Sequence, residues 1–307
     1  CSELDFEEVR QGRVAIIVNE LGNNLVRYAS KSQLIFRKVI SNCEVGIEIL
    51  SIDSGPGMDD TITMQDGYST GTTPGTGLGS VKRQSDFFDI YSAKDKGTIV
   101  VSRVFSKKYS ALESVKHLQV GAINFPMSSE TVSGDSWCVH ETAQGVAVLV
   151  SDGLGHGPAA HEASVRAVEI FSNHFRSPVE EILQTIHVGL KGTRGAAIFL
   201  LSSNQESVTF VGAGNICAAI QSASKAKTLI SQNGTAGLQV SRSKSVTQEW
   251  NQTGYLIFHS DGILGRWNLS VYPGILRKHP SILAGVLFRD FARCNDDATI
   301  LVIRRPA

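Results

Sequence analysis

Four aspartates in the second half of the chain stand at the ends of apolar runs. Asp135 precedes WCVHE, Asp152 follows GVAVLV, Asp261 follows YLIFHS, and Asp296 precedes ATILVI. An aspartate beside a glycine is also ordinary turn chemistry, which is the alternative explanation for any one of them. Together they supply what two divalent cations about 3.5–4 Å apart require, namely several carboxylates of which one bridges the ions. The pattern predicts a two-metal site.

Asp152 is suited to the bridging position. Gly153, which follows it in the segment DGLGHG, leaves its own carbonyl open to a metal ion. The small residues of this loop let the backbone approach the ions without side-chain obstruction. His156 in the same loop has two interpretations, as a hydrogen-bond donor behind the metals or as a loop residue without a role.

Three stretches near the N-terminus indicate a nucleotide pocket. They are NELGNNLVRYA at residues 19–29, DSGPG at 53–57 and GTGLG at 75–79. Each has a structural explanation when taken alone, as an exposed helix face, a turn or a flexible loop. In this order they provide a metal ligand, a carboxylate for the adenine amino group and backbone amides that close on phosphates.

Competing motifs fail on their context. The GTGLG segment lacks the preceding strand that a Rossmann fingerprint requires, and no lysine stands where a P-loop needs one. Residues 67–71, GYSTG, match the GxSxG nucleophile elbow, but polar residues precede them and a Gly-Thr loop follows. A nucleophile elbow lies between a strand and a helix, so this match is set aside.

The first hundred residues contain the elements that would position this pocket. Apolar residues between Phe6 and Ala29 repeat at helical spacing, and Glu20, Asn24 and Tyr28 form a row beside that stripe. Two strands, LIFRKVI and EVGIEILSID, follow, joined by a turn at Ser41 and Asn42. We expect a long loop over 53–79 and a closing hairpin of FFDIY and TIVVSRVF.

The second half repeats this mixture of strands and helices. Besides the runs that carry the aspartates, we expect helices at about 158–175 and 178–190, strands AAIFLLS and VTFVGAG, and a helix within 273–293. Residues 221–247 are polar and without clear periodicity. The fold class is therefore α/β (α+β) with two domains, residues 1–105 and 115–307, joined by a polar linker at 106–114.

Composition narrows the class of protein. The 307 residues include 29 basic and 29 acidic side chains in no long run, so a nucleic-acid partner is not expected. No apolar run approaches the roughly 20 residues that span a bilayer, so no membrane partner is expected. Five scattered cysteines without a CxxC pair favour the reducing cytoplasm. Because the chain begins with Cys1 and enters a helical pattern at once, we expect elements before residue 1 to be missing.

Residues 6–105 resemble the GHKL ATPase superfamily and, within it, the anti-sigma-factor serine/threonine kinases. The three N-terminal stretches correspond to the N, G1 and G2 boxes of that superfamily, and the resemblance implies a Bergerat-type α/β sandwich that binds ATP and Mg²⁺. It implies that Glu20 is the base for the substrate hydroxyl, Asn24 the Mg²⁺ ligand and Asp53 the adenine-reading carboxylate. The remaining nucleotide-binding residues that it implies are Gly55, Gly57, Gly75, Thr76, Gly77, Leu78, Gly79 and Thr98, of which 75–79 form part of the lid.

Two positions bear on whether such a kinase is active. Tyr28 stands where the family often has histidine, and it receives no role. Glu20 is present, and phosphoryl transfer needs little beyond positioning, Mg²⁺ and a base for the hydroxyl. Its presence favours an active kinase over a nucleotide sensor.

Residues 120–303 resemble the metal-dependent protein phosphatases of the 2C type, in the branch of the stage II sporulation E and RsbX-type phosphatases. The segments SGDSW, DGLGHG, GAGNI, HSDGI and DDAT occur in the family's order. The resemblance implies an αββα sandwich and two Mn²⁺ or Mg²⁺ ions. It implies that Asp152 and the Gly153 carbonyl hold both ions and that Asp135, Asp261 and Asp296 complete the site, with Asp297 less suited. Water would attack phosphorus directly, without a covalent phosphoenzyme.

Together the two resemblances predict a bifunctional partner-switching regulator. The family-implied target is a small STAS-domain anti-sigma-factor antagonist, phosphorylated by one domain and dephosphorylated by the other, with a sigma factor as a further candidate partner. One alternative is a phosphatase whose first domain only senses ATP or ADP. Another is a binding module for a sigma factor or antagonist in which catalysis is secondary. The sequence leaves the oligomeric state and the choice between Mn²⁺ and Mg²⁺ open.

Overall fold

The computed structural model describes residues 4, 6–41, 44–58, 77–107, 118–142, 144–222, 225–240, 244–250, 254–293 and 295–305. The chain divides into two compact units, which are described separately here. The first comprises residues 1–117 and 268–289, and the second comprises 118–267 and 290–307. The linker predicted at 106–114 falls mostly outside the described residues.

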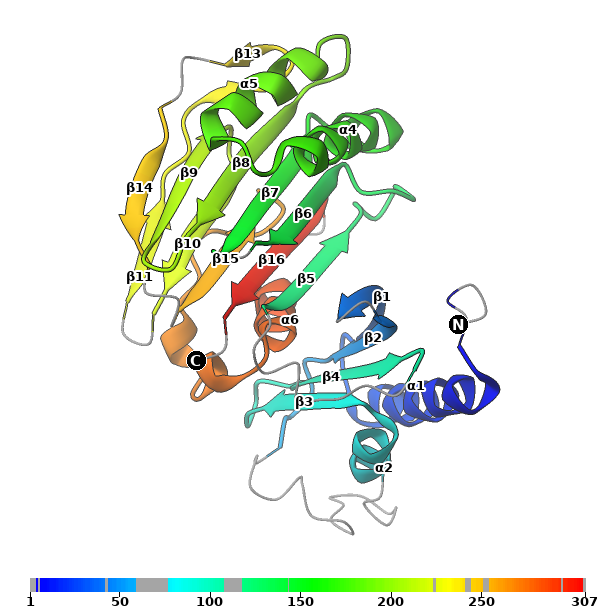
Figure 1. Ribbon diagram of the computed structural model, residues 1–307. Helices are drawn as coiled ribbons and strands as arrows, with labels where there is room; N and C mark the ends of the chain where they lie inside the picture. The colour runs from blue at the N-terminus through cyan, green and yellow to red at the C-terminus, as the bar shows by residue number, and fades with distance from the viewer. Residues whose placement is uncertain are drawn as a thin grey trace. The chain divides into compact units, whose positions relative to one another are not determined.

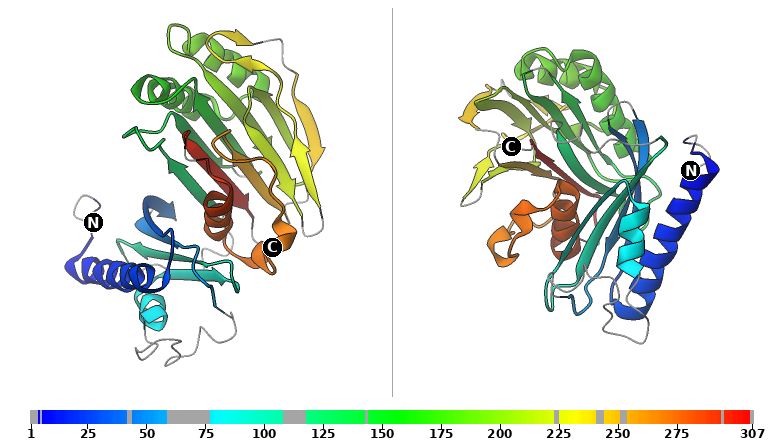
Figure 2. Two further views of the ribbon diagram at one scale, coloured as in Figure 1. Left: turned by 180° about the vertical axis from the view of Figure 1, so that it is seen from behind. Right: turned by 60° about the horizontal axis from the view of Figure 1, so that its bottom comes forward.

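The first unit has a four-stranded sheet with two helices against one face (Figure 2). Its strands are antiparallel throughout, in the order β1-β2-β4-β3. In chain order the elements are α1 (Glu8–Tyr28), β1 (Gln33–Ser41), β2 (Glu44–Ile52), α2 (Gly77–Gln84), β3 (Phe87–Ser92) and β4 (Thr98–Phe105). The predicted first helix, strand pair and closing hairpin are confirmed.

The apolar stripe of α1 builds the core on this face of the sheet. Val14, Ile17 and Leu21 are buried against Ile49 of β2 and Val100 of β4. Since alternate strand residues point to opposite faces, the neighbouring side chains of β2 and β4 must be covered from the other side. The row of Glu20 and Asn24 lies outside the buried stripe and is available to the pocket.

The second unit contains two five-stranded antiparallel sheets, which face each other across a common core (Figure 1). One has the order β11-β10-β15-β16-β5 and the other β14-β9-β8-β7-β6. The strands are β5 (Gln119–Phe125), β6 (Asp135–Glu141), β7 (Val146–Gly153), β8 (Ala196–Ser203), β9 (Ser207–Ala213), β10 (Cys217–Gln221), β11 (Ala226–Leu229), β14 (Val246–Glu249), β15 (Tyr255–His259) and β16 (Ala298–Arg304), with a two-stranded ribbon of β12 (Gly234–Thr235) and β13 (Gln239–Val240).

The two sheets enclose one apolar core, and two helices cover the outside of one of them. Val148, Phe199, Phe258 and Leu301 meet between the sheets. Helices α4 (Pro158–His174) and α5 (Val179–Gly189) pack on the outer face of the β6–β9 sheet (Figure 1). The predicted sandwich is therefore confirmed for both sheets and for one helical layer.

The helix expected within 273–293 is present but folds with the first unit. Residues 268–289 include the short 3₁₀ helices η2 (Leu269–Val271) and η3 (Ile275–Arg277) and most of α6 (Pro280–Phe291). This grouping differs from the predicted single domain of 115–307, which stays a prediction. The apolar composition of α6 predicts burial without indicating which sheet covers it.

Three further predictions need correction. Residues 77–79 were expected to end a loop, but they begin helix α2. Their high glycine content gives a low helix propensity, so the sequence did not indicate a helix here. Strands β5 and β10 were not expected, and the polar segment 221–247 contains β11 to β14. The GYSTG segment lies outside the described residues. Among those described, no helix is long and apolar enough to span a bilayer.

Candidate functional site

Two of the predicted metal ligands oppose each other directly across a strand pair. Asp135 begins β6, Asp152 lies near the end of β7, and the antiparallel register makes them Cα partners. Opposed residues on such a pair have Cβ atoms about 4.5–5.5 Å apart, and like charges at that spacing destabilise the sheet. The arrangement therefore requires a proton or a cation between the two carboxylates.

Two other predicted ligands lie at the ends of the neighbouring pair β15 and β16. Asp261 follows β15 and Asp296 precedes β16, and the bond from Ser260 N to Thr299 O, 3.1 Å, joins the two strand ends. The Asn215 amide, in the segment GAGNI, donates to Asp261 Oδ2 at 2.7 Å. This contact orients the Asp261 carboxylate and was not foreseen from the sequence.

Asp296 and Asp297 are distinguished by their hydrogen bonds. The Asp297 carboxylate is buried and accepts the backbone N–H groups of Met127, at 2.7 Å, and Gly134, at 2.8 Å. Its oxygens therefore hold backbone in place. Asp296 accepts the N–H of Asp297 at 2.9 Å and is less buried. This favours Asp296 over Asp297 as a ligand.

The electrostatics of these carboxylates fit divalent cations. Burial, together with the charge of Asp135, raises the pKa of Asp152 to about 9. Burial also raises the pKa of Asp135 to about 7, and the nearby hydroxyls of Ser260 and Thr299 offset this only in part. Asp135 Oδ2 is buried without a hydrogen-bond partner among the described residues. Cations would neutralise this excess negative charge and fill that unsatisfied position.

The charges of these carboxylates shift one another's pKa values, but the side chains do not form a complete set of metal ligands among the described residues. In the part of the chain that the structure describes, no three acidic, histidine or cysteine side chains are gathered tightly enough to hold an ion. Mutual repulsion of uncompensated charges opposes such closure. The charges of Asp135, Asp261 and Asp296 all raise the pKa of Asp152, so these carboxylates lie within electrostatic range of it.

The loop after Asp152 packs too tightly for any residue larger than glycine at position 153. A Cβ on Gly153 would lie 2.1 Å from the Ala160 carbonyl oxygen of α4. The His156 ring, for which two roles were open, forms a pair with Glu130, 2.6 Å from Nδ1 to Oε1. The exposed Arg194 guanidinium lies beside the same loop and donates to His156 O at 3.4 Å. The positively charged Arg194 side chain thus lies near the predicted metal site, and no local sequence pattern indicates this.

In the first unit, the predicted base and Mg²⁺ ligand face the start of α2. A Cβ on Gly77 would lie 3.0 Å from Glu20 Oε2 and 3.7 Å from Asn24 Nδ2. The first and third predicted nucleotide-binding stretches therefore come together. Gly77, Leu78 and Gly79 belong to α2, whereas Gly75 and Thr76 lie outside the described residues.

The predicted adenine ligand lies at the end of β2. Asp53 Oδ1 accepts the N–H of Gly55 at 2.7 Å and that of Thr98 at 3.2 Å, which connects three predicted pocket residues. Within the described residues no hydrogen bond occupies Asp53 Oδ2, so this oxygen can accept from an adenine amino group. Gly57, a little further along the chain, has a positive φ of 68°, a backbone conformation that favours glycine.

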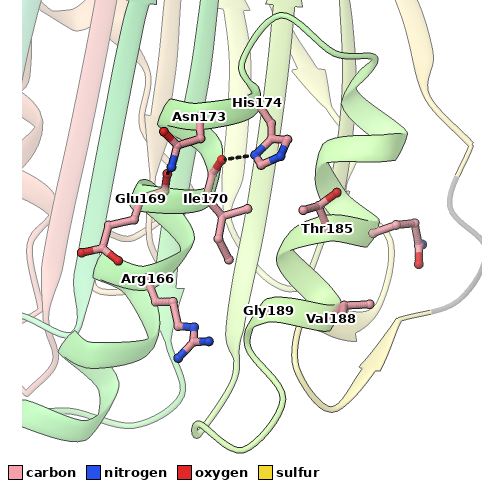
Figure 3. Close-up of a pocket in the computed structure, with 9 residues that line it drawn as sticks. Arg166, Glu169, Ile170, Asn173, His174, Thr185, Val188 and Gly189 are labelled. Carbon is pink, nitrogen blue, oxygen red and sulfur yellow. Dashed lines mark hydrogen bonds between the residues drawn. The ribbon is translucent and has the colours of Figure 1, made fainter.

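A separate groove of about 720 Å³ lies between α4 and α5 (Figure 3). Arg166 and Glu169 of α4 and Thr185 and Val188 of α5 line it, and His174 Nδ1 bonds to the Ile170 carbonyl at 2.9 Å. None of the predicted site residues lines this groove. Of the five cysteines, Cys138 and Cys217 are described, and both are free thiols.

Comparison with known proteins assigns the two halves of the chain to different families. Residues 142–306 match the family model of Stage II sporulation protein E (SpoIIE). A stretch of 99 residues is 38% identical to the serine/threonine-protein kinase RsbT of Bacillus subtilis strain 168, covering 32% of this chain and 74% of RsbT.

Several solved structures are similar in fold to large parts of this chain. A structure described under "The bacterial stressosome: a modular system that has been adapted to control secondary messenger signaling" is 26% identical, with a TM-score of 0.58 over 61% of this chain and all of the other. RsbX in complex with magnesium is 22% identical, with a TM-score of 0.54 over 62% and 96%. The SpoIIE phosphatase domain with a fragment of its regulatory domain is 17% identical, with a TM-score of 0.52 over 97% and 89%. The last two likenesses concern the fold.

Proposed function

Because this chain belongs to the SpoIIE family, with a serine/threonine phosphatase domain of the 2C type and a region homologous to the kinase RsbT, we propose that it both phosphorylates and dephosphorylates seryl or threonyl side chains of partner proteins. The direct opposition of buried Asp135 and half-buried Asp152 is the observation that carries the phosphatase half. The meeting of Glu20, Asn24 and Gly77 supports the kinase half.

In the phosphatase unit, Asp152, the Gly153 carbonyl, Asp135, Asp261 and Asp296 would hold two Mn²⁺ or Mg²⁺ ions. Bound there, the ions supply Lewis acidity toward the phosphoryl group and activate a water for attack on phosphorus. Asn215 keeps Asp261 oriented. The Arg194 guanidinium is suited to binding phosphoryl oxygens, since arginine presents a planar fork of donors to such groups.

In the first unit, a GHKL-type pocket would bind ATP. Asp53 Oδ2 would accept a hydrogen bond from the adenine amino group, Asn24 would ligate Mg²⁺, and Glu20 would accept the proton of the substrate hydroxyl. Positioning and electrostatic stabilisation provide most of the rate in such a reaction.

The partners in this proposal are STAS-domain anti-sigma-factor antagonists. The stressosome description of one similar structure and the homology to RsbT support a partner-switching role. The test incubates the protein with candidate STAS domains, ATP and Mn²⁺ and follows intact mass. We expect Asp152→Asn to leave the partner with one added phosphate and Glu20→Gln to add none, and we expect the unmodified protein to remove that phosphate from a partner phosphorylated beforehand.

Glu8→Gln and Glu169→Gln are matched controls, because both carboxylates are exposed on helices of their respective units. Loss of activity in the controls, or persistence in the two site variants, would contradict the assignment. A stable complex with the STAS domain that ignores both site variants would favour a binding module instead.

A phosphatase whose first unit only senses nucleotide is the second candidate. It is favoured by the hydrogen bond that Arg289, within the SpoIIE-matched stretch, donates to the Asp53 carbonyl at 3.3 Å. Labelling of a STAS domain from ATP, dependent on Glu20, would exclude this candidate.

A further inference from the structure

Residues 268–289 interrupt the phosphatase sequence but fold with the kinase-like unit. They lie inside the stretch that matches the SpoIIE family, between Asp261 and Asp296, two of the proposed metal ligands. The chain thus leaves the second unit after one ligand and returns to it before the other. We call residues 268–289 the docked segment.

Apolar packing fixes the docked segment on the face of the first sheet opposite α1. Residues 280–288 of α6 are buried, and its Gly285 lies on the first sheet. A Cβ on Gly285 would lie 3.0 Å from Ile99 Cγ2 and 3.7 Å from Ile52 Cδ1, so the helix backbone rests directly on β4 and β2.

A buried ionic cluster adds specific contacts to this packing. The Glu48 carboxylate of β2, only 2% exposed, binds Arg37 and Arg103 at 2.8 and 2.6 Å. It also accepts the Ser281 hydroxyl of α6 at 2.8 Å. The His279 N–H donates to Asp89 Oδ2 of β3, likewise at 2.8 Å. These contacts set one position of the segment on the sheet.

The C-terminal end of the docked segment touches the proposed adenine site. The Arg289 guanidinium donates to the backbone carbonyl of Asp53 at 3.3 Å, and Asp53 carries the proposed adenine-binding carboxylate. Ile52, which packs on Gly285, precedes Asp53 in the chain. The proposed adenine contact and the position of α6 therefore meet at one residue, Asp53.

The other consequence of this topology concerns the metal site. Where the chain leaves and re-enters the second unit, Arg293 N bonds to Gly262 O at 2.7 Å and Leu264 N to Phe291 O at 2.9 Å. This short neck adjoins Asp261 on one strand and Asp296 on the other. Only Asp290 separates the docked segment from Phe291, the first residue of this neck in its returning strand of chain.

We propose that adenine nucleotide bound at Asp53 tightens metal binding by the phosphatase unit through the docked segment. This inference rests on the proposed function of both units. Coupling between two binding sites is reciprocal and commonly changes affinity by about 5–150-fold. We expect saturating ADP to lower the Mn²⁺ concentration that half-saturates the phosphatase by about fivefold or more.

The experiment measures hydrolysis of p-nitrophenyl phosphate by the full chain at buffered free Mn²⁺, with and without ADP, while calorimetry measures ADP binding. The response should disappear in Arg289→Ala and remain in Arg277→Ala, an exposed residue of the same segment. Ser281→Ala, which removes the bond to Glu48, should reduce the response. Hydrogen exchange of residues 280–289 should slow on ADP binding in the unmodified chain.

The outcomes separate this inference from the proposed function. Absence of Mn²⁺-dependent hydrolysis would refute the phosphatase assignment, and absence of ADP binding would refute the nucleotide site; either also overturns the coupling. Hydrolysis and ADP binding with an unchanged Mn²⁺ requirement would overturn the coupling alone. If ADP changed the Mn²⁺ requirement equally in Arg289→Ala and Arg277→Ala, the route through Arg289 would be overturned.

Discussion

Replacing Asp152 by asparagine should change stability in opposite directions with and without metal. Asp152 and Asp135 oppose each other on β7 and β6, and Asp135 Oδ2 lacks a partner among the described residues. Without metal, the folded protein must either protonate Asp152, whose pKa is raised to about 9, or hold two like charges opposite each other, and the neutral variant avoids this cost of at least about 0.2–1 kcal/mol. We therefore expect Asp152→Asn to be slightly more stable than the unmodified protein when metal is removed.

With metal the order should reverse. A ligand at 100 times its Kd stabilises the folded state by about 2.7 kcal/mol. In a unit of this size each kcal/mol shifts Tm by about 2–4 °C. Mn²⁺ should therefore raise the Tm of the unmodified phosphatase unit by roughly 5–11 °C and that of Asp152→Asn by little or nothing.

Asp297→Asn is the matched control for this experiment. The Asp297 carboxylate accepts two backbone N–H groups, so its neutral replacement should destabilise the fold by about 1–3 kcal/mol whether or not Mn²⁺ is present. Calorimetric melting of the full chain, with EDTA and then with excess Mn²⁺, measures all three proteins. An Asp152→Asn variant that Mn²⁺ stabilises as much as the unmodified protein would refute the metal assignment, as would a variant destabilised equally in both conditions.

Three further predictions concern the first unit. Glu20→Ala should abolish phosphoryl transfer and spare ATP binding, whereas Asn24→Ala should weaken Mg-ATP binding as well; equal losses of ATP affinity in calorimetry would mean the two roles are misassigned. ATP and ADP should bind at least about tenfold more tightly than GTP and GDP, because a guanine carbonyl opposite Asp53 leaves two hydrogen-bond acceptors unpaired at a cost of about 1–3 kcal/mol. Asp53→Ala should reduce this ratio of affinities. Equal affinities of the unmodified protein for ATP and GTP would show that Asp53 does not bind adenine. Burial alone would raise the pKa of Glu48, but Arg37 and Arg103 lower it from 4.5 to about 2. The stabilising effect of the Glu48 carboxylate is therefore present above pH 4.5 and is lost as the pH falls toward 2. Glu48→Gln should lower the free energy of unfolding by about 3–5 kcal/mol at pH 7 and progressively less in acid. Denaturant titrations that give the same difference in unfolding free energy across this pH range would contradict the prediction.

Local patterns were sufficient for the elements that carry the proposed chemistry. The helical stripe of α1 and the apolar runs before Asp152 and Asp261 are strong periodic signals, and the structure has a helix and strands there. The glycine-rich start of α2 has low helix propensity, so its sequence indicates a loop, whereas packing of Val81 in the core holds it helical. Local propensity fails where tertiary packing decides.

The contacts that sequence reasoning missed are all between residues far apart in the chain. Asn215 with Asp261, Glu130 with His156, and Arg194 beside the same loop depend on which strands become neighbours. Periodicity identifies a strand but not its partner. The distinction between Asp296 and Asp297 has the same origin, because only the folded chain shows which carboxylate is already occupied by backbone N–H groups.

The docked segment also limits what kind of signal a nucleotide could pass to the phosphatase unit. Its contact with the proposed pocket is at Asp53, the adenine end, on the sheet face opposite α1. The groups proposed to meet the phosphates, Glu20 and Asn24, belong to α1 itself. ATP and ADP share the adenine and differ only at the phosphates. A response carried by Arg289 should therefore follow total adenine-nucleotide occupancy and not the ratio of ATP to ADP, and equal effects of the two nucleotides on the Mn²⁺ requirement would distinguish this route from one that passes through α1.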